Sequence, residues 1–300
     1  MKQAILINAH KDIDKLKELI DFFDEDFSFY IHIDRKVQLT EKEIEQLKNS
    51  QSVKFISRKY SINWGGRNFT KSILLLSKEV IKDKDIEYIH LISGQDYPIK
   101  SPKEIKNILT KKRGTEFLVN FELPSKKWAL ENGGMDRIDY FNFYDLLNAR
   151  VKIEKIIIRT LTIVQKKLNL FKRSRKCLPK LYGGSSWWTL TRPCLEYVIN
   201  YSEDNPSYLK RFMYTLSSDE IFFQTIIMNS PFAKNVINKD LRYVDWNMRN
   251  GSRPAFLDES DYDNIVSSDN IFARKFDPKI SGNLLHLLNK KLEKDKENET

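Results

Sequence analysis

The sequence contains little cysteine and no long apolar run. Its two cysteines, Cys177 and Cys194, are too few for a disulfide framework and are not spaced as metal ligands, which suits a reducing compartment. No stretch approaches the roughly 18 apolar residues of a membrane span. The first residues, MKQAILINAHKD, reach His10 and Lys11 after only a few apolar positions. We therefore expect a cytoplasmic protein without a signal peptide or a membrane anchor.

Glycine-rich phosphate loops are also missing, and HIDRK (32–36) lacks the second acid of a paired-carboxylate metal motif. The ten glycines form no Walker or dinucleotide motif, and several stand in the pairs WGG (64–66), NGG (132–134) and YGG (182–184). The segment HIDRK (32–36) offers Asp34 beside one histidine, a poor ligand set for a hard cation. We expect no essential metal ion and no cofactor; the alternative role for Asp34 is that of a simple acceptor in a turn.

The remaining composition indicates a folded α/β protein. Of the 300 residues 41% are hydrophobic, enough for a sizeable core. Over residues 1–120, nearly all-apolar strands alternate with amphipathic helices, a pattern that predicts a mostly parallel central sheet flanked by helices. We expect a single domain over 1–290, regular to 120 and less regular over 121–290, followed by a disordered charged tail, 291–300.

Polar residues follow several of these expected strands. Ala9 and His10 follow the first strand, Asp34 closes the second and Asp96 follows the later strand IHLIS. Ligands of such sheets bind at the carboxyl ends of the strands. We therefore expect these residues to lie at the ligand-binding edge.

Two other segments could contact a ligand there. In WGG, Trp64 could stack on a ligand that Gly65 allows to approach the backbone, or the motif could be a tight turn beside a core aromatic residue. Arg274 and Lys275 stand between apolar residues in IFARKFDPKI, with Arg253 upstream. Fixed cations of this kind could neutralise a diphosphate, and the alternative is a strand end with solvated basic residues.

The stretch SSDEIFFQTII, 217–227, brings a carboxylate to the start of an apolar segment. Ser217 and Glu220 have the spacing of a capping box, which predicts a helix start there. A carboxylate in the first turn of a helix is favoured as an anion, so Glu220 could also serve as a deprotonated catalytic base.

The net charge of +10 is concentrated in residues 151–180, which hold ten Lys or Arg against the single Glu154. Helical spacing there predicts an amphipathic basic helix of the kind that lies on anionic membranes; its apolar positions are Ile153, Ile156, Ile157, Val164 and Leu168. The alternative is a helix that packs its isoleucines on the domain. A non-catalytic protein that binds polyanions is a rival from another class, although aromatic residues are not interleaved with the cations.

Eight motifs in order resemble one family: NAHK, YIHIDRK, WGG, HLISGQDYPIKS, YGGSSWWTLT, SSDE, LRYVDW and FARKFD. The chain resembles the core-2/I-branching β-1,6-N-acetylglucosaminyltransferases and the related protein O-xylosyltransferases, glycosyltransferase family 14, from about residue 3 to about residue 280. The resemblance implies a GT-A type fold, a UDP-sugar donor and an inverting, metal-independent transfer. It makes 1–120 the nucleotide-sugar half and 121–290 the acceptor and catalytic half.

The same resemblance assigns roles to particular residues. Glu220 matches the catalytic base, and acceptor contacts fall on Trp246 and more loosely on Glu122 and Arg137. Donor contacts fall on Ala9, Asp34, Trp64, Lys275, Arg274 and, less securely, Arg253. We add His10 and Gly65 as donor-site neighbours, and Asp96 and Ser186 as acceptor-site neighbours, from their place in these motifs.

Departures from the family leave the acceptor and the donor sugar open. Met248 replaces a tyrosine of the branching enzymes, and Ser186 replaces an aspartate of the xylosyltransferases. We expect a bacterial relative that transfers N-acetylglucosamine, or alternatively xylose, from a UDP-sugar to a saccharide or glycolipid acceptor in surface polysaccharide or lipid-linked glycan synthesis. It would be peripheral on the inner face of the cell membrane through 151–180, with no nucleic acid as a partner. A glycoside hydrolase, a further rival, would need a second facing carboxylate.

Overall fold

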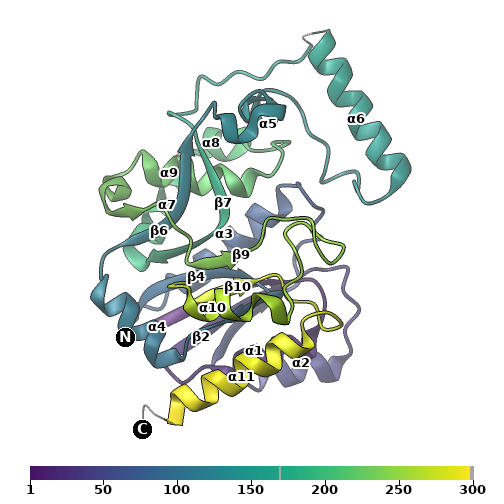
Figure 1. The fold of residues 1–300 in the computed structure, drawn as a ribbon. Coiled ribbons are helices and arrows are strands. Elements are labelled where there is room, and N and C mark those ends of the chain that lie inside the picture. The colour runs from purple at the N-terminus through teal and green to yellow at the C-terminus, as the bar shows by residue number, and fades with distance from the viewer. Residues whose placement is uncertain (169, 298–300) are drawn as a thin grey trace.

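The structure, a computed structural model, describes residues 1–168 and 170–297. A seven-stranded sheet with the order β3-β2-β1-β4-β7-β6-β8 runs through the molecule (Figure 1). Its strands are β1 (Lys2–Ala9), β2 (Phe27–Ile33), β3 (Val53–Ser57), β4 (Ile86–Ser93), β6 (Glu116–Glu122), β7 (Tyr182–Thr191) and β8 (Val236–Ile237). Only β7 runs antiparallel to its neighbours among these strands. The expected α/β fold with a mostly parallel sheet is therefore confirmed.

Both faces of the sheet are covered because β1 is apolar on both sides. Ile5 and Ile7 of β1 join one buried cluster, whereas Ala4 and Leu6 join another on the opposite face. The first cluster includes residues of α1 (Ile13–Phe22), α2 (Glu41–Lys48) and α4 (Pro102–Lys111). The second includes residues of α3 (Asn68–Val80), α7 (Arg192–Asp204), α8 (Pro206–Arg211) and α9 (Phe222–Met228).

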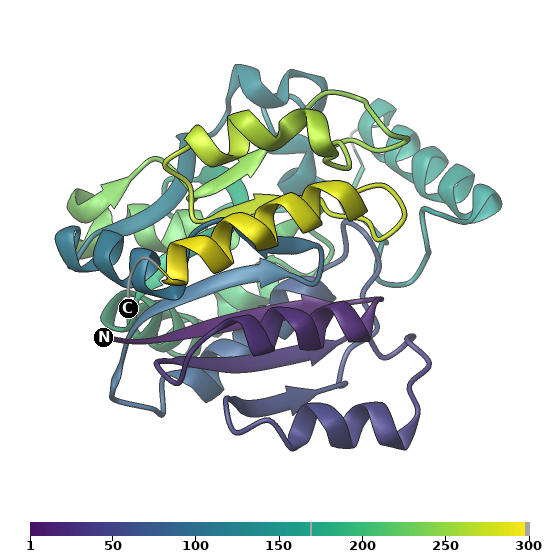
Figure 2. The same cartoon turned by 60° about the horizontal axis from the view of Figure 1, so that its bottom comes forward.

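A smaller sheet continues the fold beside the first one. It has the order β5-β10-β9, formed by β5 (Asp96–Pro98), β10 (Phe272–Arg274) and β9 (Arg242–Val244). A third buried cluster joins this sheet to α10 (Tyr262–Ser267) and α11 (Gly282–Glu297). Figure 2 shows α11 lying along the strands of the main sheet.

The expected disordered tail from residue 291 is wrong for residues 291–297. These residues belong to α11, in which Leu284, Leu288 and Leu292 recur at helical spacing and are buried. The charged residues around Leu292 concealed this apolar stripe in the sequence. Residues 298–300 lie outside the described part of the chain.

The less regular half contributes α5 (Met135–Asp139), α6 (Lys152–Lys167) and four short 3₁₀ helices. These are η1 (Lys126–Glu131), η2 (Ser218–Glu220), η3 (Pro231–Asn235) and η4 (Glu259–Asp261). Helix α6 stands apart from the sheet at one side of the molecule (Figure 1). Across residues 1–168 and 170–297, we find no helix whose length and apolar character would let it traverse a bilayer.

Candidate active site

Glu220 ends the short helix η2, two residues before α9 begins at Phe222. The expected capping box is wrong: Ser217 lies in the left-handed region with φ 46° and its side chain makes no cap hydrogen bond. The backbone N–H of Ser217 instead donates to the carbonyl of Gly65 at 2.8 Å. This tertiary contact joins the SSDE motif to the WGG motif, so the turn serves long-range assembly rather than helix initiation.

Arg137 holds the carboxylate of Glu220. Its Nη1 donates to Glu220 Oε2 at 2.5 Å, and its Nε donates to Glu131. The guanidinium carbon lies 3.8 Å from the ring centroid of Trp128, and only 12% of the Arg137 side chain is exposed. The Glu220 side chain keeps 31% of its surface exposed. Glu220 is thus fixed from one side by a stacked, doubly paired arginine and remains open to a ligand.

The surroundings of Glu220 make it a group that exchanges protons near neutral pH. Partial burial and then the charge of Asp219 raise the pKa of Glu220 to about 7, against the opposing effect of Arg137. Asp219 itself is buried and accepts a hydrogen bond from the Ser186 hydroxyl at 2.5 Å. Burial therefore offsets the stabilisation of the Glu220 anion that a helix start would give. A carboxyl with this pKa suits general base catalysis.

The WGG turn is held against the segment before α6. Gly65 has φ 78°, and a Cβ there would lie 2.7 Å from Leu216, so the turn requires glycine. Asp145 accepts hydrogen bonds from the backbone N–H groups of Arg67 at 3.2 Å and Asn68 at 3.1 Å, where α3 begins. Trp64 is 62% exposed and meets Tyr144 edge to face. The indole is therefore available for stacking at the edge that also carries Glu220.

Asp34 occupies the carboxyl end of β2 and organises that edge. Its backbone N–H donates to the carbonyl of Ala9 at 2.9 Å, and its buried carboxylate accepts from the N–H groups of Lys36 and Ile62. His10 follows β1 at the same edge. The turn-acceptor role is thus present, and through Ile62 it ties β2 to the segment that leads into WGG.

His32, the histidine beside Asp34, is a structural residue. It is fully buried, and its Nε2 accepts a hydrogen bond from the N–H of Tyr60 at 3.1 Å. Burial lowers the pKa of His32 to about 4, so its imidazole is neutral at physiological pH. In residues 1–168 and 170–297 no three His, Cys, Asp or Glu side chains gather as possible metal ligands.

Arg274, the last residue of β10, stacks on an aromatic side chain of β7. Its guanidinium carbon lies 4.3 Å from the ring centroid of Trp187, the residue after Ser186. Its buried Nε has no hydrogen-bond partner among the described residues. A stacked guanidinium with spare donor capacity is suited to an anionic ligand.

Lys275 lies beside the loop that carries Arg253. Its Nζ donates to the Ser252 hydroxyl at 2.7 Å and lies 4.6 Å from the ring centroid of Phe256. Burial and the nearby charges of Arg274, Lys11 and Arg150 lower the pKa of Lys275. Arg253 is exposed one residue beyond Ser252. The cations thus repel one another, and an anion bound among them would relieve that repulsion.

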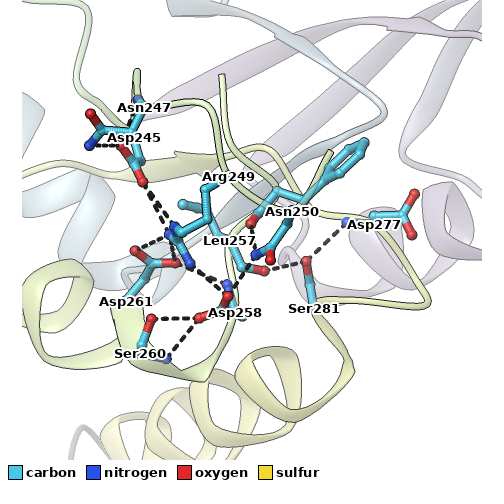
Figure 3. A network of polar contacts seen from close by, with 11 residues as sticks. Asp245, Asn247, Arg249, Asn250, Leu257, Asp258, Ser260, Asp261, Asp277 and Ser281 are labelled. Carbon is cyan, nitrogen blue, oxygen red and sulfur yellow. Dashed lines mark hydrogen bonds and ion pairs between the residues drawn. The ribbon is translucent and has the colours of Figure 1, made fainter. Parts of the chain in front are cut away.

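A second arginine fixes the loop that presents Arg253 and Trp246. Figure 3 shows Arg249 surrounded by carboxylates, with ion pairs to Asp245 at 3.1 Å, Asp258 at 2.6 Å and Asp261 at 2.6 Å. The two hydrogen bonds to Asp261 come from one nitrogen. The loop between β9 and α10 is therefore clamped at its base.

The expected acceptor residues do not all meet at Glu220. Arg137 pairs directly with Glu220. Ser186 does not contact Glu220 directly, but its hydroxyl donates to Asp219, the residue before Glu220. Asp96 is 3% exposed and accepts from the N–H and hydroxyl of Ser93, so it closes the turn after β4. Its role in acceptor binding stays a prediction.

Glu122 and Trp246 are exposed and lie outside the contacts that hold Glu220. Glu122 at the end of β6 pairs with Lys180 at 2.5 Å, and Trp246 follows β9 with 64% of its surface exposed. Neither shares a hydrogen bond, ion pair or ring contact with Glu220 in the described part of the chain. Their acceptor roles also stay predictions.

Several residues that shape the site were not found by reading the sequence. Asp219 stands in the motif SSDE beside Glu220, and its position next to the candidate base was a usable signal. Trp128, Glu131 and Asp145 belong to none of the sequence motifs. Trp128 and Glu131 are identified only by their contacts with Arg137, and Asp145 only by its contact with the residues after the WGG turn.

The family model described as Core-2/I-Branching enzyme matches residues 4–266. Xylosyltransferase 2 of Rattus norvegicus is 24% identical over 95% of this chain and 33% of its own length. Xylosyltransferase oxt of Drosophila pseudoobscura pseudoobscura is 23% identical over 84% of this chain and 29% of its own length. The chain thus spans about a third of the length of these curated relatives.

Among solved structures, the crystal structure of S. aureus TarS is similar to part of the chain. It has a TM-score of 0.32 and 17% identity, and the match covers 40% of this chain and 21% of TarS. A structure of TarS 1–349 in complex with UDP matches with a TM-score of 0.31 and 17% identity over 40% of this chain and 35% of that one.

Proposed function

Because the chain belongs to the core-2/I-branching enzyme family, we propose that it is an inverting glycosyltransferase that transfers a sugar from a UDP-sugar to a hydroxyl of a saccharide acceptor. The preferred donor is UDP-N-acetylglucosamine. The observation that carries the proposal is the state of Glu220, which is held by Arg137, has its pKa raised to about 7 and keeps part of its surface open.

Glu220 acts as the general base in this proposal. Oε2 is occupied by Arg137, which leaves Oε1 to accept the proton of the acceptor hydroxyl. The hydroxyl oxygen forms a bond to the anomeric carbon from the face opposite the diphosphate, and the bond to UDP breaks with its electron pair leaving on the diphosphate. Proton transfer of this kind contributes on the order of 100- to 10,000-fold in rate.

Fixed cations stabilise the leaving diphosphate. Arg274 and Lys275 lie on consecutive positions, and Arg253 extends from the loop that hydrogen-bonds Lys275. Their positive charge supplies the stabilisation that a divalent ion supplies in other transferases, so we propose a metal-independent reaction. Trp64 and Asp34 would flank the nucleoside at the carboxyl ends of the strands.

UDP-xylose is the second candidate donor. It is favoured by the xylosyltransferases among the relatives, which this chain matches over most of its own length. In this proposal the acceptor is a saccharide or a glycolipid, and the enzyme works on the cytoplasmic side of a bacterial membrane. We propose no nucleic-acid partner, since the basic segment lacks interleaved aromatic residues.

The test combines UDP binding with the variant Glu220→Gln. We expect UDP to bind in the presence of EDTA with the same affinity to the wild type and to Glu220→Gln, while turnover of the variant falls on the order of 100-fold or more. Glu259→Gln, an exposed carboxylate on η4, is the matched control and should retain full turnover. Slow hydrolysis of individual UDP-sugars without acceptor identifies the donor.

Near-normal turnover of a folded Glu220→Gln protein would exclude Glu220 as the base. Absence of UDP binding with EDTA, restored by Mn²⁺ or Mg²⁺, would exclude the metal-independent mechanism.

A further inference from the structure

Helix α6 contacts the rest of the molecule mainly through polar groups. Gln165 exchanges two hydrogen bonds of 3.0 Å with the backbone of Phe141, and Lys166 pairs with Asp136 at 2.5 Å. Glu154 accepts from the N–H of Asn148 at 2.5 Å. Ile158 is the apolar residue that is buried on this side. The helix is therefore attached by a specific polar face.

The isoleucine-rich face of α6 lies beside the buried positions Ile158 and Gln165 and is itself exposed. Side chains on it keep much of their surface exposed: Ile153 62%, Ile157 41%, Leu161 40%, Val164 42% and Leu168 61%. At about 100° per residue these positions fall within roughly 80° of one another around the helix. Ile156 and Ile163, next to this set on the side further from the domain, are 50% and 52% exposed. The alternative that the isoleucines pack on the domain is therefore wrong for all of them except Ile158. We call this set the outer apolar face of α6.

Cations flank the outer apolar face on one side. Lys152, Lys155, Arg159 and Lys167 form no ion pair within the described chain. Arg173, by contrast, is bound into the domain by hydrogen bonds to Thr215 and Arg211 and by its stacking on Phe141. The surface available to a partner thus combines an exposed apolar stripe with unpaired positive charge.

We propose that the outer apolar face of α6 and its four unpaired cations form a docking surface for an anionic lipid bilayer, with the helix lying in the plane of the interface. Apolar side chains would enter the acyl boundary while Lys and Arg meet anionic headgroups. Uncompensated positive charge favours an anionic surface over an apolar protein groove. This docking does not depend on the donor or on the chemistry at Glu220.

The position of α6 gives the docking a consequence for the active site. Arrows of the N-terminal strands in Figure 2 point toward the side on which α6 lies, so the carboxyl ends of the sheet and α6 share one side of the molecule. The first residue of α6 follows Asp145, which holds the WGG turn, by only seven positions, a span of at most about 25 Å. A docked α6 would therefore keep the donor edge close to the bilayer, where a lipid-linked acceptor resides.

The test is flotation of the full chain with vesicles of phosphatidylcholine, alone and mixed with phosphatidylglycerol. We expect binding to mixed vesicles that weakens with salt, and little binding to phosphatidylcholine alone. The double variant Ile157→Glu with Val164→Glu should bind at least about tenfold more weakly. Neutralising Lys155 and Arg159 to Gln should weaken binding about fivefold for each cation.

Leu209→Glu, at a comparably exposed leucine of α8, is the matched control and should bind like the wild type. UDP affinity and the thermal midpoint of each variant show that the fold is intact. The proposal is overturned if the wild type does not bind mixed vesicles, or if both α6 variants bind them normally. It is also overturned if the outer apolar face instead mediates dimerisation, seen as a concentration-dependent dimer that Ile157→Glu with Val164→Glu abolishes while vesicle binding persists.

Discussion

Replacing Arg137 tests whether its charge sets the protonation of Glu220. The guanidinium lowers the pKa of Glu220 through its charge and its hydrogen bond, while burial and Asp219 raise that pKa to about 7. In Arg137→Met the opposing effect is gone and the pKa of Glu220 rises further. Since a base must be deprotonated to work, the rising limb of kcat/KM against pH should move to higher pH.

The expected size of the pKa change follows from the distance of 2.5 Å between Arg137 Nη1 and Glu220 Oε2. An opposite charge this close typically changes a carboxyl pKa enough to alter ionisation at a fixed pH by tenfold or more. We therefore expect kcat/KM of Arg137→Met to fall at least about tenfold at pH 7 and to recover in part above pH 8. Arg137→Lys keeps the charge and should keep the position of the limb.

The assay is kcat/KM for the UDP-sugar and its acceptor between pH 5.5 and 9.5, with UDP affinity measured on each variant. Removing one partner from a buried ion pair can cost about 3–5 kcal/mol of stability, so thermal melting must show that the protein is folded at the assay temperature. A folded Arg137→Met protein whose limb stays in place, with activity lowered equally at every pH, would refute the electrostatic argument. Arg137 would then serve only to orient other groups.

Three further variants test other parts of the structure. Lys275→Ala should weaken UDP binding by roughly 10- to 100-fold by calorimetry, because a charged donor is lost, whereas the exposed Lys279→Ala should not change it. Gly184→Ala should lower the denaturation midpoint, because the added Cβ would lie 1.8 Å from a backbone carbonyl oxygen of β6. This overlap costs at least about 1–3 kcal/mol of stability. Gly282→Ala, the control, places its Cβ in open space and should leave the midpoint unchanged. Arg249→Met leaves three acidic residues without their shared partner, and it should raise the Kd for UDP by loosening the clamped loop without changing the pH limb of kcat. Unchanged UDP affinity in a folded Lys275→Ala or Arg249→Met protein would contradict the assigned diphosphate site.

Much of the donor edge could be expected from the sequence. The apolar strands dictate a sheet buried on both faces, and the residues at the carboxyl ends of β1 and β2 then lie together at one edge, as Ala9 and Asp34 do. The motif order also indicated the family that the family model matches. These features depend on local periodicity and on the order of motifs, which the sequence displays directly.

Contacts between distant segments decided the geometry and the protonation of the catalytic motif. Ser217 has the spacing of a helix cap, yet its N–H pairs with Gly65 more than 150 residues away and its side chain caps nothing. The pKa of Glu220 depends on its burial, on the charge of Asp219 and on the approach of Arg137. The folded chain sets the burial and the distance to Arg137, which the sequence does not display.

The face that α6 presents to its surroundings was likewise undetermined by the sequence. Periodicity places the isoleucines on one side of the helix, but a core and a bilayer are equally apolar partners. Only the tertiary structure, by attaching α6 through Gln165 and Lys166, turns that side outward. Local patterns therefore determined which elements form and which residues share a face, whereas long-range packing decided what each face meets, because burial and charge at any residue are set by the segments folded against it.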